Sequence, residues 1–433
     1  MSAVFWRALY RLVLLLAWPF VHLRLRLRAR REPEYGIRIA ERFGRVPDDI
    51  PRGVIWFHTV SAGETIAAAP LIAALADEFT GVPFLVTTMT PTGSAQVQQR
   101  LGGRVSHCYA PYDFPHAVGR FYERVEPRLL VLMETELWPT LLAGARDREI
   151  PALLVNARLS ERSARGYARI GGLSRPMLAG LCRIACQYPD HAARFRSLGA
   201  DPARIDVLGN VKFDVTLPAD HASRVSEMRV SWNLQDRPVW IAASTHEGEE
   251  SLALEAHGLL CRQFPDALLI LVPRHPSRAA AVARQVDAAG MAYRRTSLDL
   301  DTGADGDRVA VVLGDRMGEL LYLYGLADVA LLGGSLVPVG GHNPIEAAVC
   351  GIPLLMGPQR FNFADVATAF EEADCLRTVT DVVSLAGALA ACFADPERCH
   401  RNGARARQVV AQNAGATERL RVLLREQIRQ ALS

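Results

Sequence analysis

Lysine is almost absent from this chain of 433 residues. Lys212 is the only one, so arginine supplies the other 48 of the 49 basic side chains. With 46 acidic side chains, the formal net charge is only +3. A surface so close to charge balance excludes a protein that binds nucleic acid over its whole surface, and any site for anions must therefore be local.

Several common sequence signatures are also missing. The chain has neither a G-x-G-x-x-G fingerprint nor a G-x-x-x-x-G-K-[ST] loop, which argues against a dehydrogenase and an ATPase. No C-x-x-C pair occurs among the eight cysteines, so we expect reduced, buried thiols in a reducing compartment. No group of carboxylates or histidines has the spacing of metal ligands, and we predict no metal and no other cofactor.

The N-terminal segment, residues 1–32, has no acidic side chain before Glu32 and carries seven arginines around the apolar run from Leu12 to Val21. This composition favours an anionic lipid surface on the cytoplasmic side. The run is about half as long as the ~20 residues of a spanning helix, and Pro19 lies inside it. No small-residue cleavage site follows, which argues against a secretory signal. We predict a membrane anchor that lies on or dips into the bilayer; the alternative is a first helix packed on the body of the protein.

The rest of the chain is long enough for about two domains, because a single core rarely grows beyond ~250–300 residues. From residue 54 onward, short apolar runs alternate with amphipathic stretches, which is typical of parallel sheets covered by helices on both faces. We predict two such α/β domains, at 33–217 and 218–433, connected within the polar stretch 215–238. The strands are expected at 54–57, 84–87, 129–132, 152–155, 184–186, 239–243, 267–272, 309–313, 329–332 and 353–356.

In such sheets ligands bind beyond the carboxyl ends of the strands, so the loops that follow strands hold the candidate site. Glu64 follows the first strand at the start of a helix. A carboxylate there either caps the helix or accepts a proton from a substrate hydroxyl. Glu134 and Glu136 follow the third strand, and their spacing leaves open which of them faces the site.

Lys212 is the single departure from arginine and lies in the sequence GNVKFD. A compact ammonium group suits a place beside a carboxylate or a leaving phosphate that a planar guanidinium does not fill, and retention by chance is the alternative. Another strand is followed by Asn156, Arg158, Arg162 and Arg165. These side chains fit either an anion site or a solvated helix face.

The C-terminal half repeats strand-to-helix turns with features of anion sites. WIAASTHEGEE predicts the start of a helix, and Arg274 follows the strand at 267–272, where it can pair with a phosphate. The glycine-rich segment from Gly333 to Glu346 leads into another helix. Its N-terminal amides suit a phosphate, and the Glu346 carboxylate suits ribose hydroxyls. The segment indicates a nucleotide-sugar site, with an ordinary capped helix as the alternative.

The motifs VSAGE, TTMTPTGS, METELWP, NARLSERS, VKFD, STHEGEE, LVPRHP, MGEL and GGHNPIEAA occur in this order from about residue 36 to the C-terminus. On these motifs the chain resembles the 3-deoxy-D-manno-octulosonic acid (Kdo) transferases of Gram-negative lipopolysaccharide biosynthesis. The resemblance implies an α/β fold of the GT-B type, with two Rossmann-like domains facing across a cleft and an N-terminal membrane-associated helix. It also implies attachment to the cytoplasmic side of the cell inner membrane.

The resemblance further implies a metal-free, inverting transfer of Kdo from its cytidine monophosphate conjugate, CMP-Kdo, to a lipid A precursor, lipid IVA. By motif, Glu64 is similar to the general base, and Glu134 and Lys212 are similar to groups that stabilise the transition state. The implied contacts to CMP are Pro273, Arg274, Met317, Gly318, Glu319, Asn343, Pro344, Ile345 and Glu346. Ala62 stands where a bulkier residue commonly precedes the glycine of VSAGE, and we expect the base to stay in place.

Two alternatives remain at the level of sequence. A GT-B transferase for another nucleotide sugar, such as a heptosyl or N-acetylglucosaminyl donor, would carry the same kind of site. An inactive, membrane-bound nucleotide-binding scaffold would bind nucleotide and release none when lipid is added. The presence of Glu64, Glu134 and Lys212 together argues against the scaffold.

Overall fold

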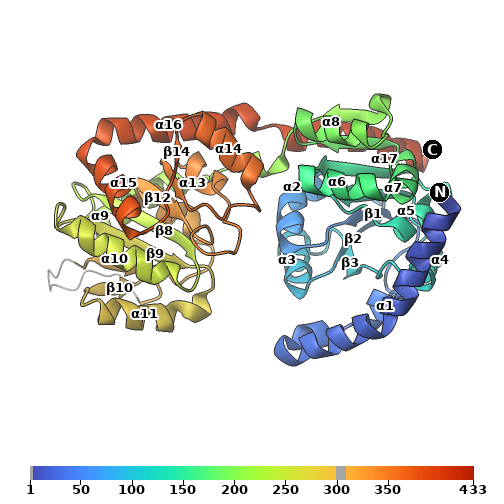
Figure 1. Cartoon of the computed structure of the whole chain (residues 1–433), viewed down its shortest axis with the longest axis horizontal. Coiled ribbons are helices and arrows are strands. Elements are labelled where there is room, and N and C mark those ends of the chain that lie inside the picture. The colour runs from blue at the N-terminus through green and yellow to red at the C-terminus, as the bar shows by residue number, and fades with distance from the viewer. Residues whose placement is uncertain (1–2, 299–308) are drawn as a thin grey trace. The chain divides into compact units, whose positions relative to one another are not determined.

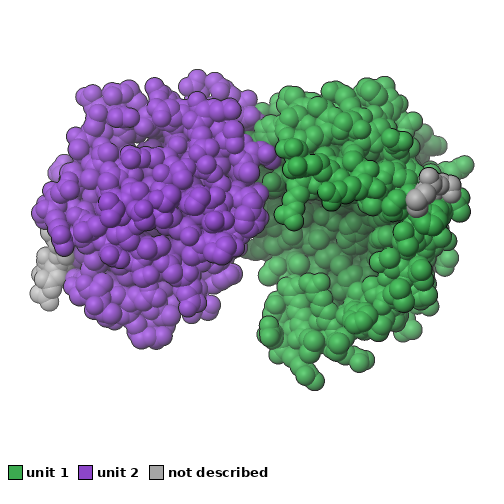
Figure 2. Space-filling model, in the orientation of Figure 1, with its two compact units in different colours: residues 1–214, 414–433 green, residues 215–413 purple. Residues whose placement is uncertain are grey.

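The computed structural model describes residues 3–298 and 309–433 and divides the chain into two compact units (Figure 2). Unit 1 comprises residues 1–214 and 414–433, and unit 2 comprises residues 215–413. Each unit is built around one parallel sheet with helices on its faces (Figure 1). The predicted α/β class is therefore confirmed in both halves of the chain.

The sheet of unit 1 has the strand order β3-β2-β1-β4-β5-β6-β7, and every pairing in it is parallel. The order reverses between β1 and β4, which is the switch point where ligands bind in doubly wound sheets. The strands are β1 (Ile55–His58), β2 (Phe84–Thr88), β3 (Ser106–Tyr109), β4 (Leu129–Met133), β5 (Ala152–Ala157), β6 (Arg183–Cys186) and β7 (Ile205–Val207).

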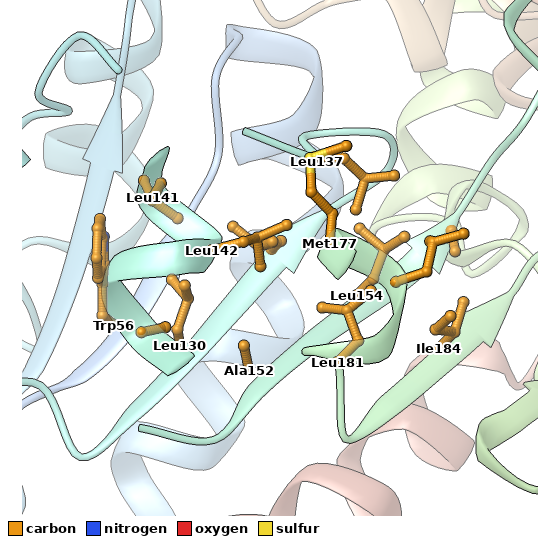
Figure 3. Packing of buried hydrophobic residues seen from close by; sticks show 14 of the residues in the cluster. Trp56, Leu130, Leu137, Leu141, Leu142, Ala152, Leu154, Met177, Leu181 and Ile184 are labelled. Atoms are coloured by element: carbon orange, nitrogen blue, oxygen red, sulfur yellow. The ribbon is translucent and has the colours of Figure 1, made fainter. Parts of the chain in front are cut away.

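Helices bury both faces of this sheet, as a parallel sheet requires. One face packs Trp56, Leu130 and Leu154 against Leu141 and other apolar side chains of the covering helices (Figure 3). The helices of unit 1 after the first are η1 (Pro33–Gly36), η2 (Ile39–Phe43), α2 (Ala62–Glu78), α3 (Pro91–Leu101), α4 (Pro115–Val125), α5 (Pro139–Arg146), α6 (Glu161–Arg169), α7 (Gly171–Ala179), α8 (Pro189–Ser197), η3 (Pro202–Arg204), η4 (Val211–Phe213) and α17 (Ala416–Leu432).

The first helix, α1 (Ala3–Arg31), is continuous through Pro19 and packs on unit 1 along one face only. Trp18 lies against Phe43 and Phe114, with ring centres 5.1 and 4.9 Å apart. Its other face exposes large apolar side chains, among them Val4, Phe5, Leu9, Leu12, Val13, Leu15, Leu16, Phe20, Leu23 and Leu27. The helix is long and apolar enough to cross a membrane by length and composition.

The sheet of unit 2 has the order β10-β11-β9-β8-β12-β13-β14 and is also parallel, with its switch point between β8 and β12. The strands are β8 (Val239–Thr245), β9 (Leu268–Pro273), β10 (Tyr293–Arg295), β11 (Val311–Leu313), β12 (Val329–Leu332), β13 (Leu354–Met356) and β14 (Leu376–Thr378). The helices are α9 (His221–Ser231), α10 (Glu249–Cys261), η5 (Pro276–Arg278), α11 (Ala279–Ala288), α12 (Leu320–Leu326), α13 (Ile345–Val349), α14 (Ala364–Glu372), α15 (Val382–Ala394) and α16 (Pro396–Asn413).

All ten predicted strands are present, with small shifts at their ends. Helix α17 differs from the prediction of one continuous domain at 218–433, because it packs on unit 1. Its apolar stripe of Leu420, Leu424 and Ile428 is buried against the core beneath α2, and Arg421 and Arg425 pair with Glu78 at the end of α2. The stretch between the predicted domains contains α9, which belongs to unit 2. All eight cysteines are free, but only Cys108, Cys186, Cys375 and Cys399 are buried as predicted, and the other four are partly exposed.

Candidate active site

The turn between β1 and α2 carries Glu64. Ser61 precedes α2, and its hydroxyl accepts a hydrogen bond from the Glu64 amide at 3.3 Å. The Glu64 carboxylate reaches back over the turn: Oε1 accepts from the Ser61 hydroxyl and Oε2 accepts from the Val60 amide, both at 2.9 Å. Glu64 therefore does cap its helix. Proton chemistry remains open to it, because each carboxylate oxygen keeps a second lone pair.

The environment of Glu64 favours its protonated form. The side chain is 8% exposed. Burial first, and then the negative charges of Glu134 and Glu136, raise the pKa of its carboxyl to about 8, against the lowering effect of the hydrogen bonds from Val60 and Ser61. A pKa near neutral pH suits a group that takes up a proton during a reaction.

Glu134 follows β4, the neighbour of β1 at the switch point, and forms an ion pair with Lys212. The Lys212 ammonium donates to Glu134 Oε1 at 2.6 Å, and the two side chains are only 20% and 17% exposed. Glu136 is held elsewhere, because its Oε2 accepts a hydrogen bond from the Trp138 indole at 2.8 Å. Of the two glutamates, Glu134 is thus the partner of the lysine, and Glu136 is the partner of the Trp138 indole.

Lys212 is placed by two asparagines. It lies on η4, where the Asn210 carboxamide oxygen accepts from the Lys212 amide at 3.0 Å and caps the turn. The Asn156 carboxamide oxygen, from the end of β5, accepts from the Val211 amide at 3.2 Å. Glu134 and Asn156 both have left-handed backbone, with φ of 54° and 50°. Strain of this kind in residues other than glycine costs about 1–3 kcal/mol and is concentrated at functional sites.

Of the arginines that follow β5, Arg158 lies beside this cluster, and Arg162 and Arg165 lie on α6. Arg158 contributes its backbone, which donates to the Glu134 carbonyl and accepts from the Thr135 hydroxyl. Arg162 and Arg165 lie on the exposed face of α6, and Arg165 pairs there with Glu161 at 3.7 Å. Arg162 and Arg165 therefore lie on a solvated helix face, which is one of the two alternatives that the sequence left open.

The residues implied to contact CMP all follow strands of unit 2 at the carboxyl edge of its sheet. Pro273 ends β9, and Arg274 beyond it is exposed. The loop between β11 and α12 exposes Met317 and Gly318, and Glu319 directly precedes α12. Glu319 lies 3.7 Å from Arg316 and 3.9 Å from Arg224.

The loop between β12 and α13 and the first turn of α13 supply the remaining four residues implied to contact CMP. Asn343 accepts from the Ile345 amide at 3.1 Å and so caps α13 itself. Pro344 and Ile345 are buried, and Glu346 lies half-buried in the first turn of the helix. Because α13 has only five residues, its amides form a weaker anion site than the sequence indicated.

Glu249 was predicted only to lie at the start of a helix, but it has a second role in the structure, where its side chain is fully buried. Its carboxylate accepts four backbone hydrogen bonds, from the amides of His246, Gly334, Ser335 and Leu336, at 2.6–3.0 Å. It therefore fixes the loop after β8 to the loop after β12. A glutamate four residues after a strand end is an ordinary helix cap in sequence, and only the fold shows that it also binds the second loop.

The placement of the His, Cys, Asp and Glu side chains decides whether the described residues could hold a metal ion. Within residues 3–298 and 309–433, no group of three or more His, Cys, Asp or Glu side chains is placed to hold a metal ion. Lys212 in unit 1 and Arg274 in unit 2 place positive charge near the carboxyl edges of the two sheets.

The fold matches that of solved enzymes of known class. A glycosyltransferase from Rickettsia africae has a TM-score of 0.56 and 13% sequence identity, with 88% of this chain and 99% of that chain covered. At this identity the similarity concerns the fold alone. Two parallel seven-stranded sheets with helices on their faces define the class: an α/β glycosyltransferase fold of the GT-B type.

Sequence relatives identify the family within that class. The family described as 3-Deoxy-D-manno-octulosonic-acid transferase (kdotransferase) matches residues 37–215. The 3-deoxy-D-manno-octulosonic acid transferase of Haemophilus influenzae is 37% identical over 97% of this chain and 98% of its own length. The same enzyme from Bordetella pertussis is 39% identical over 95% of this chain and 97% of its own. The chain belongs to the Kdo transferase family and is a glycosyltransferase.

Proposed function

We propose that the chain transfers Kdo from CMP-Kdo to a lipid A precursor, lipid IVA, with inversion at the anomeric carbon and Glu64 as the general base. The observation that carries the proposal is the cluster at the switch point of unit 1. There a nearly buried carboxyl with a pKa of about 8 interacts with the ion pair of Glu134 and Lys212. Such a cluster combines a proton acceptor with fixed charges that stabilise a polar transition state.

As base, the Glu64 carboxylate takes the proton of the acceptor hydroxyl. The hydroxyl oxygen attacks the anomeric carbon of Kdo, and the bond from that carbon to the phosphate of CMP breaks. Only the ionised carboxylate can take the proton, so the rate rises with pH as Glu64 ionises around pH 8. Burial makes the ionised form a stronger base than an exposed glutamate.

The departing CMP carries negative charge, which the protein must offset. We assign this role to Lys212 and Arg274 and propose that no metal ion is needed. Lys212 is held in one position by Glu134 and by the capped turn of η4, so little reorganisation is required when charge develops. Arg274 lies at the carboxyl end of β9, and its planar guanidinium can bind a phosphate through two hydrogen bonds.

We further propose that α1 lies along the inner membrane on its cytoplasmic side and does not span it. The Tyr10 hydroxyl donates to Asp113 at 2.8 Å, and Trp18 is packed between the rings of Phe43 and Phe114, so the helix is fixed to unit 1 along its length. The apolar side chains on its other face would enter the lipid, and the arginines of its C-terminal half would meet anionic headgroups.

The test of the proposed base is Glu64→Gln. This change keeps the size of the side chain and removes the proton acceptor, so we expect kcat to fall about 10²- to 10⁴-fold while CMP binding is retained. Mass spectrometry of lipid IVA incubated with CMP-Kdo measures the rate and counts the sugars added. Glu161→Gln on exposed α6 is the matched control and should behave as wild type.

Two outcomes would overturn the proposal. A Glu64→Gln variant with a rate near that of wild type would remove Glu64 from the mechanism. Stronger competition by UDP or ADP than by CMP would assign a different donor. In wild type, the rate should rise with pH towards a plateau above about pH 8, and a rate that falls over that range would contradict a base with a raised pKa.

A further inference from the structure

The carboxyl edge of the sheet in unit 2 holds a pair of histidines that the proposed mechanism does not use. His246 follows β8, and His342 lies in the loop between β12 and α13. The two loops meet because β8 and β12 are neighbours at the switch point. The imidazole rings are parallel, with centres 5.1 Å apart, and their Nε2 atoms are 2.8 Å apart.

A nitrogen–nitrogen distance of 2.8 Å requires a shared hydrogen, because two lone pairs or two N–H groups would repel each other. One Nε2 atom therefore donates and the other accepts. In the neutral pair, this leaves one Nδ1–H donor and one Nδ1 lone pair. Addition of one proton turns both Nδ1 atoms into donors and gives the pair one positive charge. Neither Nδ1 atom has a hydrogen-bond partner among the described residues.

The backbone holds the two rings in position without any ligand. Glu249 Oε2 accepts from the His246 amide at 2.9 Å and from the Gly334 amide at 2.6 Å, so one carboxylate oxygen fixes both loops. The His342 amide donates to the Gly333 carbonyl at 3.1 Å. A side chain at Gly334 would lie 3.1 Å from the His342 ring. Such preorganisation is expected of a binding site.

Charged groups of both signs surround the pair. Arg274, His275 and Arg278 follow β9, the other neighbour of β8. Burial first, and then the positive charge of Arg274 and the neighbouring histidines, lower the pKa of His342 to about 4. Burial and the charges of Arg274 and Arg278 lower the pKa of His246, against the raising effect of Glu249.

The nearby acidic groups are already engaged. Glu249 accepts its four amide hydrogen bonds, and Glu247 and Glu250 pair with Arg278 at 3.5 and 3.1 Å. The groups that face the imidazoles are thus an exposed arginine and a third histidine, and an anionic ligand would compensate them.

We propose that His246, His342 and Arg274 together bind anionic oxygens of the sugar donor, and that the histidine pair takes up one proton when the donor binds. This inference rests on the proposed function, because it takes CMP-Kdo as the donor. The oxygens belong either to the phosphate or to the carboxylate of Kdo. Each Nδ1–H of the protonated pair would donate to one of them, in hydrogen bonds that are about twice as strong as those of neutral groups.

The sign of the pH dependence follows from this uptake. The free pair is neutral at pH 7, because burial and neighbouring charge disfavour its protonation. A bound anion favours the protonated form, so donor binding takes up a proton and tightens as pH falls. The affinity changes by at most tenfold per pH unit when uptake is complete. This trend is opposite to that of kcat, which rises with pH as Glu64 ionises.

The experiment compares wild type with His246→Gln and His342→Gln, because glutamine can share a hydrogen bond but cannot hold the extra proton. Calorimetric titration with CMP near pH 6.5, in buffers of different ionisation enthalpy, counts the protons taken up. The second ionisation of CMP itself lies near pH 6, so the difference between proteins is the result. Wild type should take up more protons than either variant and bind CMP about 3- to 10-fold more tightly. His400→Gln, which removes an exposed imidazole on α16 away from the pair, should match wild type.

A second arm measures KM for CMP-Kdo, whose phosphodiester does not titrate, between pH 6 and 8.5. If the pair binds the phosphate, both CMP and CMP-Kdo show the difference between wild type and the variants; if it binds the Kdo carboxylate, only CMP-Kdo does. Equal proton uptake and equal KM profiles in wild type and both variants would overturn the inference. If one variant does not fold, the other decides, because the pair needs both rings. A wild type that binds neither CMP nor CMP-Kdo would overturn the proposed function and this inference with it.

Discussion

The two sheets of this transferase carry different ionisable groups at the same topological position. At the switch point of unit 1, Glu64 and the Glu134–Lys212 ion pair meet. At the switch point of unit 2, two imidazoles and an arginine meet, and the one carboxylate among them, Glu249, is satisfied by backbone amides. One fold therefore presents an acidic edge and a basic edge, which is what a reaction between a hydroxyl and an anionic sugar donor requires.

The comparison shows that a carboxylate after a strand has no fixed role. Glu64 and Glu249 both lie at the start of the helix that follows the first strand of their unit, and both reach back to backbone amides. Glu64 accepts one backbone hydrogen bond and one from a hydroxyl, which leaves its charge poorly compensated. Glu249 accepts four backbone hydrogen bonds and is structural. The number of donors, and not burial alone, separates a candidate base from a scaffold group.

The largest expected effect in this comparison is on kcat, and it follows from removing Lys212, the cation of the acidic edge. Lys212→Ala would leave Glu134 without its partner and the developing charge without a donor, and we expect kcat to fall about 10²- to 10³-fold. Lys212→Arg keeps the charge but replaces a compact ammonium with a planar group that does not fit the same space, so it should restore less than a tenth of the wild-type rate. Steady-state kinetics with CMP-Kdo measures both. Arg162→Lys on α6 is the control, and full activity of Lys212→Arg would contradict a geometric role for the lysine.

The second-largest expected effect is on stability, and it concerns Glu249, which joins the two loops of the basic edge. Glu249→Gln replaces one acceptor oxygen with an amino group, so two of the four amide donors lose their partner inside the protein. Each unsatisfied donor costs about 1–3 kcal/mol, and thermal or urea unfolding of the variant should show a loss of that order. The positions of His246 and His342 also change, so the affinity for CMP should fall.

Glu250 offers a matched control for this test, because it is the next residue and is equally buried. Its Oε1 accepts from Arg278 and from the Thr245 hydroxyl, and its Oε2 has no hydrogen-bond partner among the described residues. Glu250→Gln therefore leaves no amide donor unsatisfied and should lose clearly less stability than Glu249→Gln. Equal losses in the two variants would mean that burial, and not the four hydrogen bonds, determines the cost.

The sequence predicted the interior of both sheets but missed their edges. The four strands without a prediction, β3, β7, β10 and β14, are the outer strands of the two sheets. Edge strands here are short and carry polar or charged side chains, as in Tyr293–Arg295, so they lack the apolar run by which a central strand is recognised. The placement of α17 on unit 1 was missed because an amphipathic stripe shows that a helix is buried on one face but not which core it covers.

The candidate site was also predicted only in part: its residues could be selected, but their contacts could not. Glu64 could be selected from the sequence because it follows a predicted strand, and Lys212 because it is the only lysine. The spacing left Glu134 and Glu136 open, and the motif resemblance singled out Glu134. The contacts between these residues could not be predicted, because the Glu134–Lys212 pair joins residues 78 positions apart. The roles of Asn156 and Glu249 were also hidden, since both act through backbone amides that belong to distant loops.

The smallest expected effect tests how the acidic edge is held. Asn156→Ala removes the acceptor for the Val211 amide and places alanine in left-handed backbone, so we expect a loss of about 1–3 kcal/mol in unfolding free energy and a lower kcat at unchanged KM for CMP-Kdo. Asn156→Gly tolerates the backbone conformation and still lacks the acceptor. It should therefore recover part of the stability but not the rate, because Lys212 stays misplaced in both variants. Recovery of the full rate in Asn156→Gly would show that backbone strain, and not the hydrogen bond to η4, positions the lysine beside Glu134.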